Sequence, residues 1–186
     1  LRLKNVSPNQ IARTTIRRGA EIFAFGLLFR LQEYVIAWGW APKTDLLRVD
    51  VLNTIGASMM LMGVLCWLVL QAERRLISSA PEKSKGGPSL PRFLRQGWGT
   101  GKPVQVVLIL ASSATALLIS LVTPLLWTTW RPNWLPWPLA SYIDGAHNLG
   151  VPQASLFPLF PWAGFAFAGL ALGFILQSTW ARTNEP

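Results

Sequence analysis

Charged residues, cysteine and histidine are all scarce in this chain of 186 residues. Only 13% of its residues are charged, whereas a soluble domain carries about a quarter. The single cysteine, Cys66, lies in an apolar stretch, which excludes a disulfide framework within the chain. The single histidine, His147, is far from Cys66 in sequence, so the ligand spacing of a zinc site is missing and no metal site is expected.

Common signatures of soluble enzymes and of nucleic-acid-binding proteins are missing as well. The sequence has no Gly-x-Ser-x-Gly elbow and no Gly-Lys-Ser/Thr phosphate loop. The net charge of +9 would suit a nucleic-acid groove only if aromatic and basic residues were interleaved. Tryptophans and basic residues mostly occupy different segments, so we expect no nucleic-acid partner. We also expect no covalently bound cofactor.

Long apolar runs are what the sequence has in quantity. Four segments with few charges, at about 19–40, 51–71, 103–127 and 158–180, are long enough to cross a bilayer core of about 30 Å as helices. A helix also satisfies its own backbone hydrogen bonds in lipid. The sequence therefore predicts an all-α fold, a polytopic transmembrane helix bundle of about four transmembrane helices. Residues 1–186 form a single transmembrane region in this prediction, with the lipid bilayer as first partner.

The Lys and Arg residues predict the orientation of these spans, because cytoplasmic connections are enriched in them. Most precede the first span, follow the fourth or occupy the 72–102 linker: Arg2, Lys4, Arg13, Arg17, Arg18, Arg74, Arg75, Lys83, Lys85, Arg92, Arg95, Lys102 and Arg182. Tryptophans gather at the opposite ends, as is typical of a membrane interface: Trp38, Trp40, Trp127, Trp130, Trp134, Trp137 and Trp162. We expect a bacterial inner membrane, both termini and linker 72–102 in the cytoplasm, and 128–157 as the outer connection.

Four polar residues break the apolar pattern in the outward halves of the first two spans: Arg30, Glu33, Asp50 and Asn53. An arginine at mid-bilayer costs about 2.5–3.5 kcal/mol on insertion scales. Arg30 and Glu33 are three residues apart, so they share a helix face and can pair. The four residues are candidates for a polar pocket. The alternatives are a buried ion pair that joins two helices and, for Asp50, a cap at a helix N-terminus.

Small residues mark the fourth span. Gly164, Gly169 and Gly173 alternate with alanines, and Gly169 and Gly173 form the Gly-x-x-x-Gly spacing that lets two helix backbones approach closely. We interpret these three glycines as helix-packing residues rather than as part of a reaction site.

Two strings carry a resemblance to a known family. The segment 47–56 reads Leu-Arg-Val-Asp-Val-Leu-Asn-Thr-Ile-Gly, and 156–164 reads Leu-Phe-Pro-Leu-Phe-Pro-Trp-Ala-Gly. Together with segment 17–33, they resemble bacterial relatives of heparan-α-glucosaminide N-acetyltransferase, a family of polytopic membrane enzymes with more helices than four. The residues that carry the resemblance are Arg48, Asp50, Gly56, Phe157, Pro158, Phe160, Pro161, Trp162 and Gly164.

The resemblance implies transfer of an acyl group from cytoplasmic acyl-CoA to an acceptor outside, usually a carbohydrate. The family has an Arg/Asp/Arg-Gly helix followed by a catalytic histidine; these 186 residues contain no such segment, and His147 does not lie in that motif. No catalytic residue is therefore assigned. The chain opens with Leu1 rather than Met, and we expect further helices of the same protein, or other membrane subunits, as partners. The alternative is a non-catalytic structural subunit of a larger membrane complex, such as a photosynthetic or respiratory one.

Overall fold

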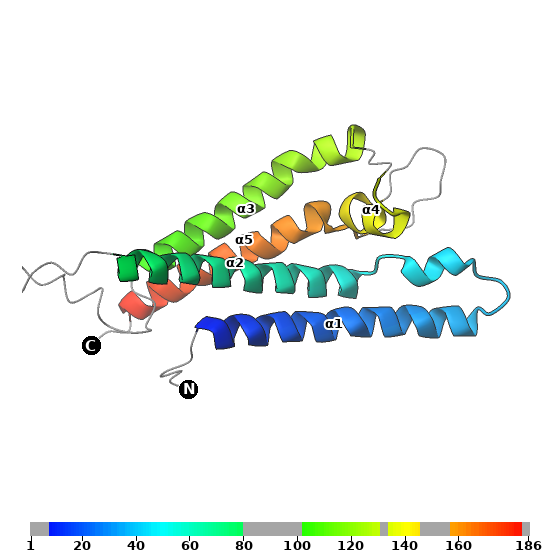
Figure 1. Cartoon of the computed structure of the whole chain (residues 1–186), viewed down its shortest axis with the longest axis horizontal. Helices are drawn as coiled ribbons and strands as arrows, with labels where there is room; N and C mark the ends of the chain where they lie inside the picture. Colours follow the sequence, from blue (N-terminus) through cyan, green and yellow to red (C-terminus); the bar gives the residue numbers. More distant parts are fainter. Residues whose placement is uncertain (1–7, 80–101, 131–133, 146–156, 184–186) are drawn as a thin grey trace, which may run out of the picture.

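A computed structural model describes residues 8–79, 102–130, 134–145 and 157–183 of the chain. Its elements are α1 (Pro8–Ile36), the 3₁₀ helix η1 (Lys43–Leu47), α2 (Val51–Ser79), α3 (Lys102–Thr128), α4 (Trp137–Asp144) and α5 (Leu159–Thr183) (Figure 1). The regular elements of the described residues are all helices, with no strand among them. The all-α helix bundle predicted from the sequence is confirmed.

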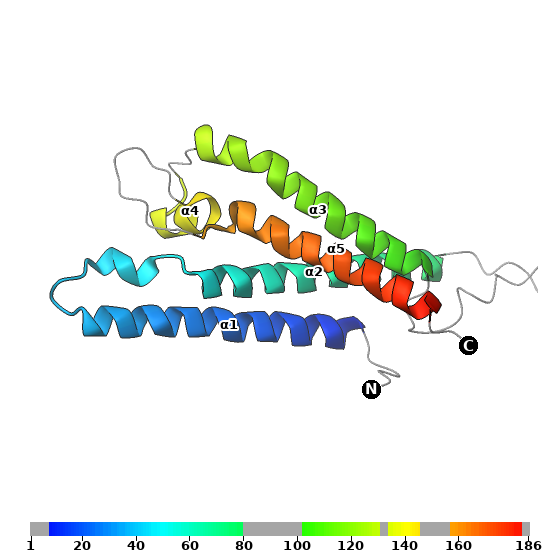
Figure 2. The ribbon, with the colours of Figure 1, turned by 180° about the vertical axis from the view of Figure 1, so that it is seen from behind.

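The long helices form two antiparallel pairs. Helix α1 runs along α2, and α3 runs along α5, while α5 lies against α2 and joins the two pairs (Figures 1 and 2). The start of α1 and the end of α5 lie at one end of the bundle, and η1 and α4 lie at the other (Figure 1). We refer to the end with η1 and α4 as the outer end, following the orientation predicted from the charges.

Three of the helices, α2, α3 and α5, are long and apolar enough to cross a membrane. Helix α1 is 29 residues long, as is α2, but Glu21, Arg30 and Glu33 interrupt its apolar sequence. It packs along α2 nonetheless, and this packing is more extensive than that of any other helix pair in the described residues. Helix α1 is therefore the fourth long helix of the bundle, and it lies beside a helix that is apolar enough to span a membrane.

Helices α1 and α2 extend well beyond their predicted spans at the inner end, and α1 stops short of its predicted outer end, whereas α3 and α5 lie within three residues of their predicted bounds. Helix α1 begins at Pro8 rather than near Gly19, and it ends at Ile36, so Trp38 and Trp40 follow in turns. Helix α2 continues to Ser79, into the segment predicted as the cytoplasmic linker. Charged residues can occupy helical turns outside the apolar core, which is why hydropathy alone misplaces these ends. Linker residues 80–101 lie outside the described part.

Two apolar clusters hold α2, α3 and α5 together. Toward the inner end, Leu70 packs with Val104 and Leu108. In the outer half, Ile119 of α3 packs with Ala163 and Phe167 of α5. These side chains are almost completely buried, whereas the other faces of the helices expose large apolar side chains, as expected for surfaces that contact lipid.

Hydroxyl side chains within α3 satisfy their hydrogen bonds inside the same helix. Thr115, Ser120 and Thr123 donate to the backbone carbonyls four residues earlier, at 2.7–2.9 Å. This local bonding removes the need for an outside partner. Among the buried hydroxyls of the described part of α3, Ser112 differs, because its Oγ has no hydrogen-bond partner. Helix α3 can therefore lie in an apolar environment although its sequence contains several hydroxyl side chains.

Glycines bring α1 and α2 into backbone contact. A Cβ added at Gly19 would lie 2.7 Å from the carbonyl oxygen of Gly56, and one added at Gly56 would lie 2.6 Å from both the Gly19 oxygen and the Phe23 nitrogen. At Gly63, an added Cβ would lie 2.9 Å from Ile16. Only glycine permits this approach.

The glycines that were predicted as packing residues on α5 have different surroundings. An added Cβ at Gly164 would lie 3.3 Å from Ile119 on α3, in tight contact, but at Gly169 or Gly173 it would meet nothing within 4 Å. Within the described residues, then, Gly169 and Gly173 face open space. Their role in packing stays a prediction that concerns a partner beyond these helices.

Candidate functional site

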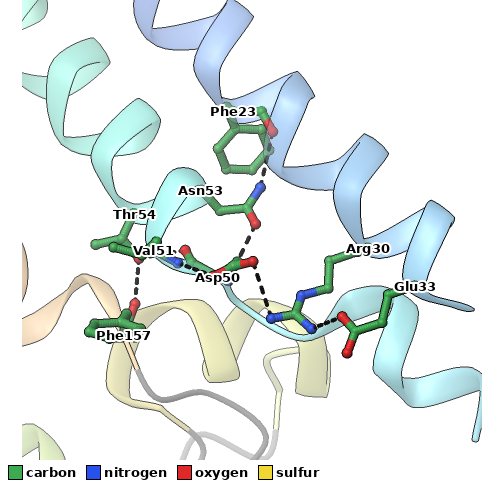
Figure 3. Close-up of polar contacts among 8 residues, drawn as sticks. All are labelled: Phe23, Arg30, Glu33, Asp50, Val51, Asn53, Thr54 and Phe157. Atoms are coloured by element: carbon green, nitrogen blue, oxygen red, sulfur yellow. Dashed lines mark hydrogen bonds and ion pairs between the residues drawn. The ribbon is translucent and has the colours of Figure 1, made fainter. Parts of the chain in front are cut away.

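The four polar candidates from the sequence meet at the outer end of the α1–α2 pair (Figure 3). Arg30 projects from α1 and is largely buried, with 12% of its side chain exposed. The terminal nitrogen Nη1 donates to Glu33 Oε2 on the same helix, and Nη2 lies 3.3 Å from Asp50 Oδ2 at the start of α2. We use "outer polar cluster" for Arg30, Glu33, Asp50 and Asn53.

Asp50 also forms the start of α2. Its Oδ1 accepts a hydrogen bond from the Val51 backbone N–H at 2.6 Å, which satisfies one of the free donors at the helix N-terminus. Its other oxygen, Oδ2, pairs with Arg30. The carboxylate therefore caps α2 and holds the arginine at once, so the two roles considered from the sequence are not exclusive.

Asn53 joins the two helices through its side-chain amide. It is fully buried, donates from Nδ2 to the Phe23 carbonyl at 3.0 Å, and accepts the Asp50 backbone N–H at 3.3 Å. Gly26 makes room for it, since an added Cβ there would lie 2.7 Å from Asn53 Nδ2. Asn53 is thus a structural tie beneath the ion pairs and is not open to a ligand.

A further hydrogen bond connects α2 to the segment before α5. The Thr54 hydroxyl donates to the Phe157 carbonyl, and Figure 3 shows this contact on the side of the first α2 turn away from Arg30. Pro158 is fully buried next to it. Farther along, Trp127 of α3 donates to the Phe160 carbonyl at 3.3 Å. The Phe-Pro-Leu-Phe-Pro-Trp string is therefore fixed by contacts to two other helices.

Aromatic rings extend from this string toward the middle of α5. The Phe157 and Trp162 ring centroids are 5.2 Å apart, and Trp162 and Phe165 are 5.7 Å apart, both with tilted geometry. Such separations are typical of favourable aromatic pairs. Of the other residues in the resemblance, Arg48 follows η1 and is half-buried, and Gly56 contacts α1 as described above.

Helix α4 brings a tyrosine near the outer polar cluster. The Tyr142 ring lies 5.8 Å from the Phe23 ring, centroid to centroid. Burial raises the pKa of the Tyr142 phenol, and the positive charge of Arg30 partly opposes that rise. The phenol is therefore neutral at physiological pH and able to donate a hydrogen bond. Ser141 and Asp144 on the same helix are buried.

An open cavity of about 470 Å³ lies beside the outer polar cluster, between the end of α1 and the start of α2. Its walls include Phe29, Gln32, Glu33, Ile36, Asp50 and Val51. Glu33 is the most accessible charged group there, with 66% of its side chain exposed, whereas Arg30 is engaged with both carboxylates. We call this space the polar cavity. Most of its lining is apolar, and its polar groups, on Gln32, Glu33 and Asp50, can accept hydrogen bonds from a ligand with hydroxyl or amino donors.

Sequence reasoning found the members of this cluster but not their supports. Thr54, Tyr142 and Gly26 were not selected, because their roles depend on contacts between distant segments. One signal was available: Gly19 and Gly26 are seven residues apart on α1, as are Gly56 and Gly63 on α2, a spacing that keeps them near one helix face. His147 lies outside the described residues. In the described part, no group of three or more His, Cys, Asp and Glu residues is placed to hold a metal ion.

Comparison with known proteins gave no match to a family model, to a curated protein or to a solved structure.

Proposed function

We propose that this chain is the membrane-embedded part of an acyltransferase that moves an acyl group from cytoplasmic acyl-CoA to an acceptor on the outer side, such as a carbohydrate. One observation carries the proposal. The described parts of the three segments that resemble the family, 17–33, 47–56 and 157–164, meet around the first turn of α2, where Arg30 pairs with Asp50 on one side and Thr54 bonds to Phe157 on the other. Segments that share an origin in one active site would be expected to meet in this way.

In such a reaction, a hydroxyl or amino group of the acceptor attacks the thioester carbonyl carbon of acyl-CoA. A new C–O or C–N bond forms, the C–S bond breaks, and the proton of the acceptor leaves with the thiol. We assign the polar cavity to the acceptor, because Glu33 and Asp50 present acceptor oxygens to its hydroxyl or amino hydrogens. Arg30 acts as a positioning residue that holds both carboxylates. No residue is assigned as catalytic base.

The proposed location is the bacterial inner membrane, with the start of α1 and the end of α5 on the cytoplasmic side. Two observations support this. Both helix ends lie at the same end of the bundle (Figure 1), and Arg13, Arg17 and Arg18 lie exposed on the first turns of α1. Basic residues favour the cytoplasmic face.

Substituting Arg30 by Leu in the full-length protein tests the proposal. Loss of the guanidinium leaves Glu33 and Asp50 as neighbouring, uncompensated carboxylates, so we expect acyl transfer to be abolished. The measurement is transfer of a radiolabelled acetyl group from acetyl-CoA to carbohydrate in membrane vesicles. Arg13→Leu, on the exposed inner part of the same helix, is the matched control and should retain activity. Unchanged turnover in Arg30→Leu would remove the proposal.

A second function, that of a non-catalytic subunit of a larger membrane complex, is favoured by the outward face of α5. Phe165, Leu172 and Leu176 are exposed there at 54–68%, beside Gly169 and Gly173, which have open space around them. A second helix can approach such a face closely. Recovery of the chain in fixed ratio with other membrane proteins, without acyl transfer, would favour this function over the first.

A further inference from the structure

A second hollow, whose lining is more uniformly apolar, adjoins the polar cavity at Val51. It runs between α2 and α5, has a volume of about 340 Å³, and is lined chiefly by Ile55, Met59, Met62, Phe157, Trp162 and Phe165. We call it the apolar groove. The aromatic pairs of Phe157 with Trp162 and of Trp162 with Phe165 form one of its walls.

The hydroxyls along the apolar groove do not change its character. Thr54 lines it, but this hydroxyl is engaged with the Phe157 carbonyl. Ser58 also lines it and is almost completely buried. The surface that remains for a ligand is hydrocarbon, aromatic ring and thioether. Such a surface fits an alkyl chain and offers no partner to a polar group.

The length of the apolar groove matches one leaflet of a membrane. On α2 its lining extends from Val51 to Met62, which corresponds to about 16 Å along the helix axis. Half of a hydrocarbon core is about 15 Å. Because the groove begins at the outer end of α2, its length matches one alkyl chain of a molecule that lies in the outer leaflet.

The polar cavity and the apolar groove meet at Val51, which lines both. In Figure 3, Thr54 and Phe157 lie on one side of the first α2 turn, and Arg30 and Glu33 lie on the other. The polar side carries one positive and two negative charges, since Arg30 faces both Glu33 and Asp50. An excess of carboxylate favours a head group with hydroxyl or amino donors and disfavours a phosphate monoester.

We propose that the two hollows form one binding site for an amphiphile, with a single alkyl chain in the apolar groove and a hydroxyl- or amino-bearing head group in the polar cavity. This inference rests on the proposed function in one respect, because it names the acceptor as a lipid-linked sugar or amino alcohol rather than a soluble one. Binding itself requires neither acyl-CoA nor turnover.

The test uses the full-length protein in phosphatidylcholine nanodiscs and a decyl β-glucoside with a diazirine in its chain. After photolysis, peptide mapping should find the label on the groove residues Met59, Met62 or Phe165. Ala166→Phe fills the apolar groove from α5 and should remove this labelling. Ala168→Phe is the matched control, since residue 168 lies exposed on the same helix away from the groove; its labelling should equal that of the native protein.

Two further arms test the head group. Decyl β-glucoside without the diazirine should compete, whereas methyl β-glucoside and decyl phosphate should not. Glu33→Gln removes one carboxylate charge from an exposed side chain and should weaken the labelling. Labelling that persists in Ala166→Phe, or that decyl phosphate suppresses as well as the glucoside does, overturns the inference. The labelling experiment contains no acyl-CoA, so it measures binding only. Intact labelling, together with no acyl transfer in the separate activity assay, would reject the proposed function and leave this inference standing.

Discussion

At the scale of single residues, the surroundings of Arg30 are central to the candidate site. A guanidinium in the outward half of a helix bundle is tolerated here because two carboxylates hold it, one from its own helix and one from the next. The sequence alone supplied the pairing with Glu33, since three residues on a helix set that distance. It offered an ion pair between two helices, with Asp50 as a partner of Arg30, only as one of several hypotheses, because that pairing depends on how α1 and α2 align. That alignment is set by glycines and by Asn53.

Asn53→Leu is a test of this alignment. The substitution removes the hydrogen bond to the Phe23 carbonyl and the one from the Asp50 N–H, so both backbone groups lose a buried partner. We expect the free energy of unfolding to fall by about 1–2 kcal/mol, the size that interhelical hydrogen bonds reach in membrane systems. Thermal unfolding of the purified protein in mild detergent gives the measurement.

Ser113→Leu is the control for this prediction. Residue 113 is an exposed serine on α3, so a leucine there meets lipid or detergent and the stability should stay within about 0.5 kcal/mol of the native value. Equal stability of Asn53→Leu and the native protein would show that the two hydrogen bonds contribute nothing to helix alignment.

At the scale of elements, the helices themselves were predictable and their contacts only partly so. The start of α2 was expected at Val51, because Asp50 precedes a long apolar run, and the helix begins there. The start of α1 was missed, because Arg13, Arg17 and Arg18 make its first turns resemble a flanking segment. Close backbone contact with a neighbouring helix was expected on α5, which contains the Gly-x-x-x-Gly pair. The structure has its tightest glycine contacts between α1 and α2 instead.

Paired glycine substitutions separate these two helix faces. Gly56→Leu forces a side chain against the α1 backbone, where even a Cβ would lie 2.6 Å from two backbone atoms. We expect a loss of about 3 kcal/mol or more in stability, at the upper end of typical overpacking costs. Gly169→Leu adds the same side chain where nothing lies within 4 Å, and the isolated chain should unfold as the native one does.

The same pair of variants bears on the second candidate function. If a separate helix packs on α5, Gly169→Leu should leave the purified chain stable while it abolishes recovery of that partner from native membranes. A stability loss as large in Gly169→Leu as in Gly56→Leu would contradict the difference between the two faces.

At the scale of the whole molecule, the bundle is thin, and each apolar helix buries little of itself within the chain. The sequence predicted a polytopic helix bundle because its apolar runs are long, and three helices meet the length and apolarity that a membrane requires. Helix α4 was not predicted: its 8 residues, Trp137–Asp144, are too few for a periodic pattern to stand out in a segment rich in proline and tryptophan. The position of Tyr142 beside Phe23 depends on contacts between distant segments, so local sequence could not predict it.

The orientation of the whole molecule is testable with introduced cysteines, since Cys66 is the single native one. In a Cys66→Ser background, we expect Ser84→Cys, in the linker predicted as cytoplasmic, to react with a membrane-impermeant maleimide in inverted vesicles but not in intact cells. Asn148→Cys, in the predicted outer connection, should show the opposite pattern. Labelling of Ser84→Cys from outside intact cells would reverse the orientation.

The charge partners of Arg30 have a consequence for biogenesis. Glu33 lies on α1 and Asp50 at the start of α2, so both carboxylates belong to the hairpin of α1 and α2, as do Asn53 and the glycines that bring these two helices close together. When α1 and α2 leave the insertion machinery together, the arginine can already be neutralised inside that hairpin. We therefore expect α1 and α2 to enter lipid as a pair in which the charge of Arg30 is already compensated.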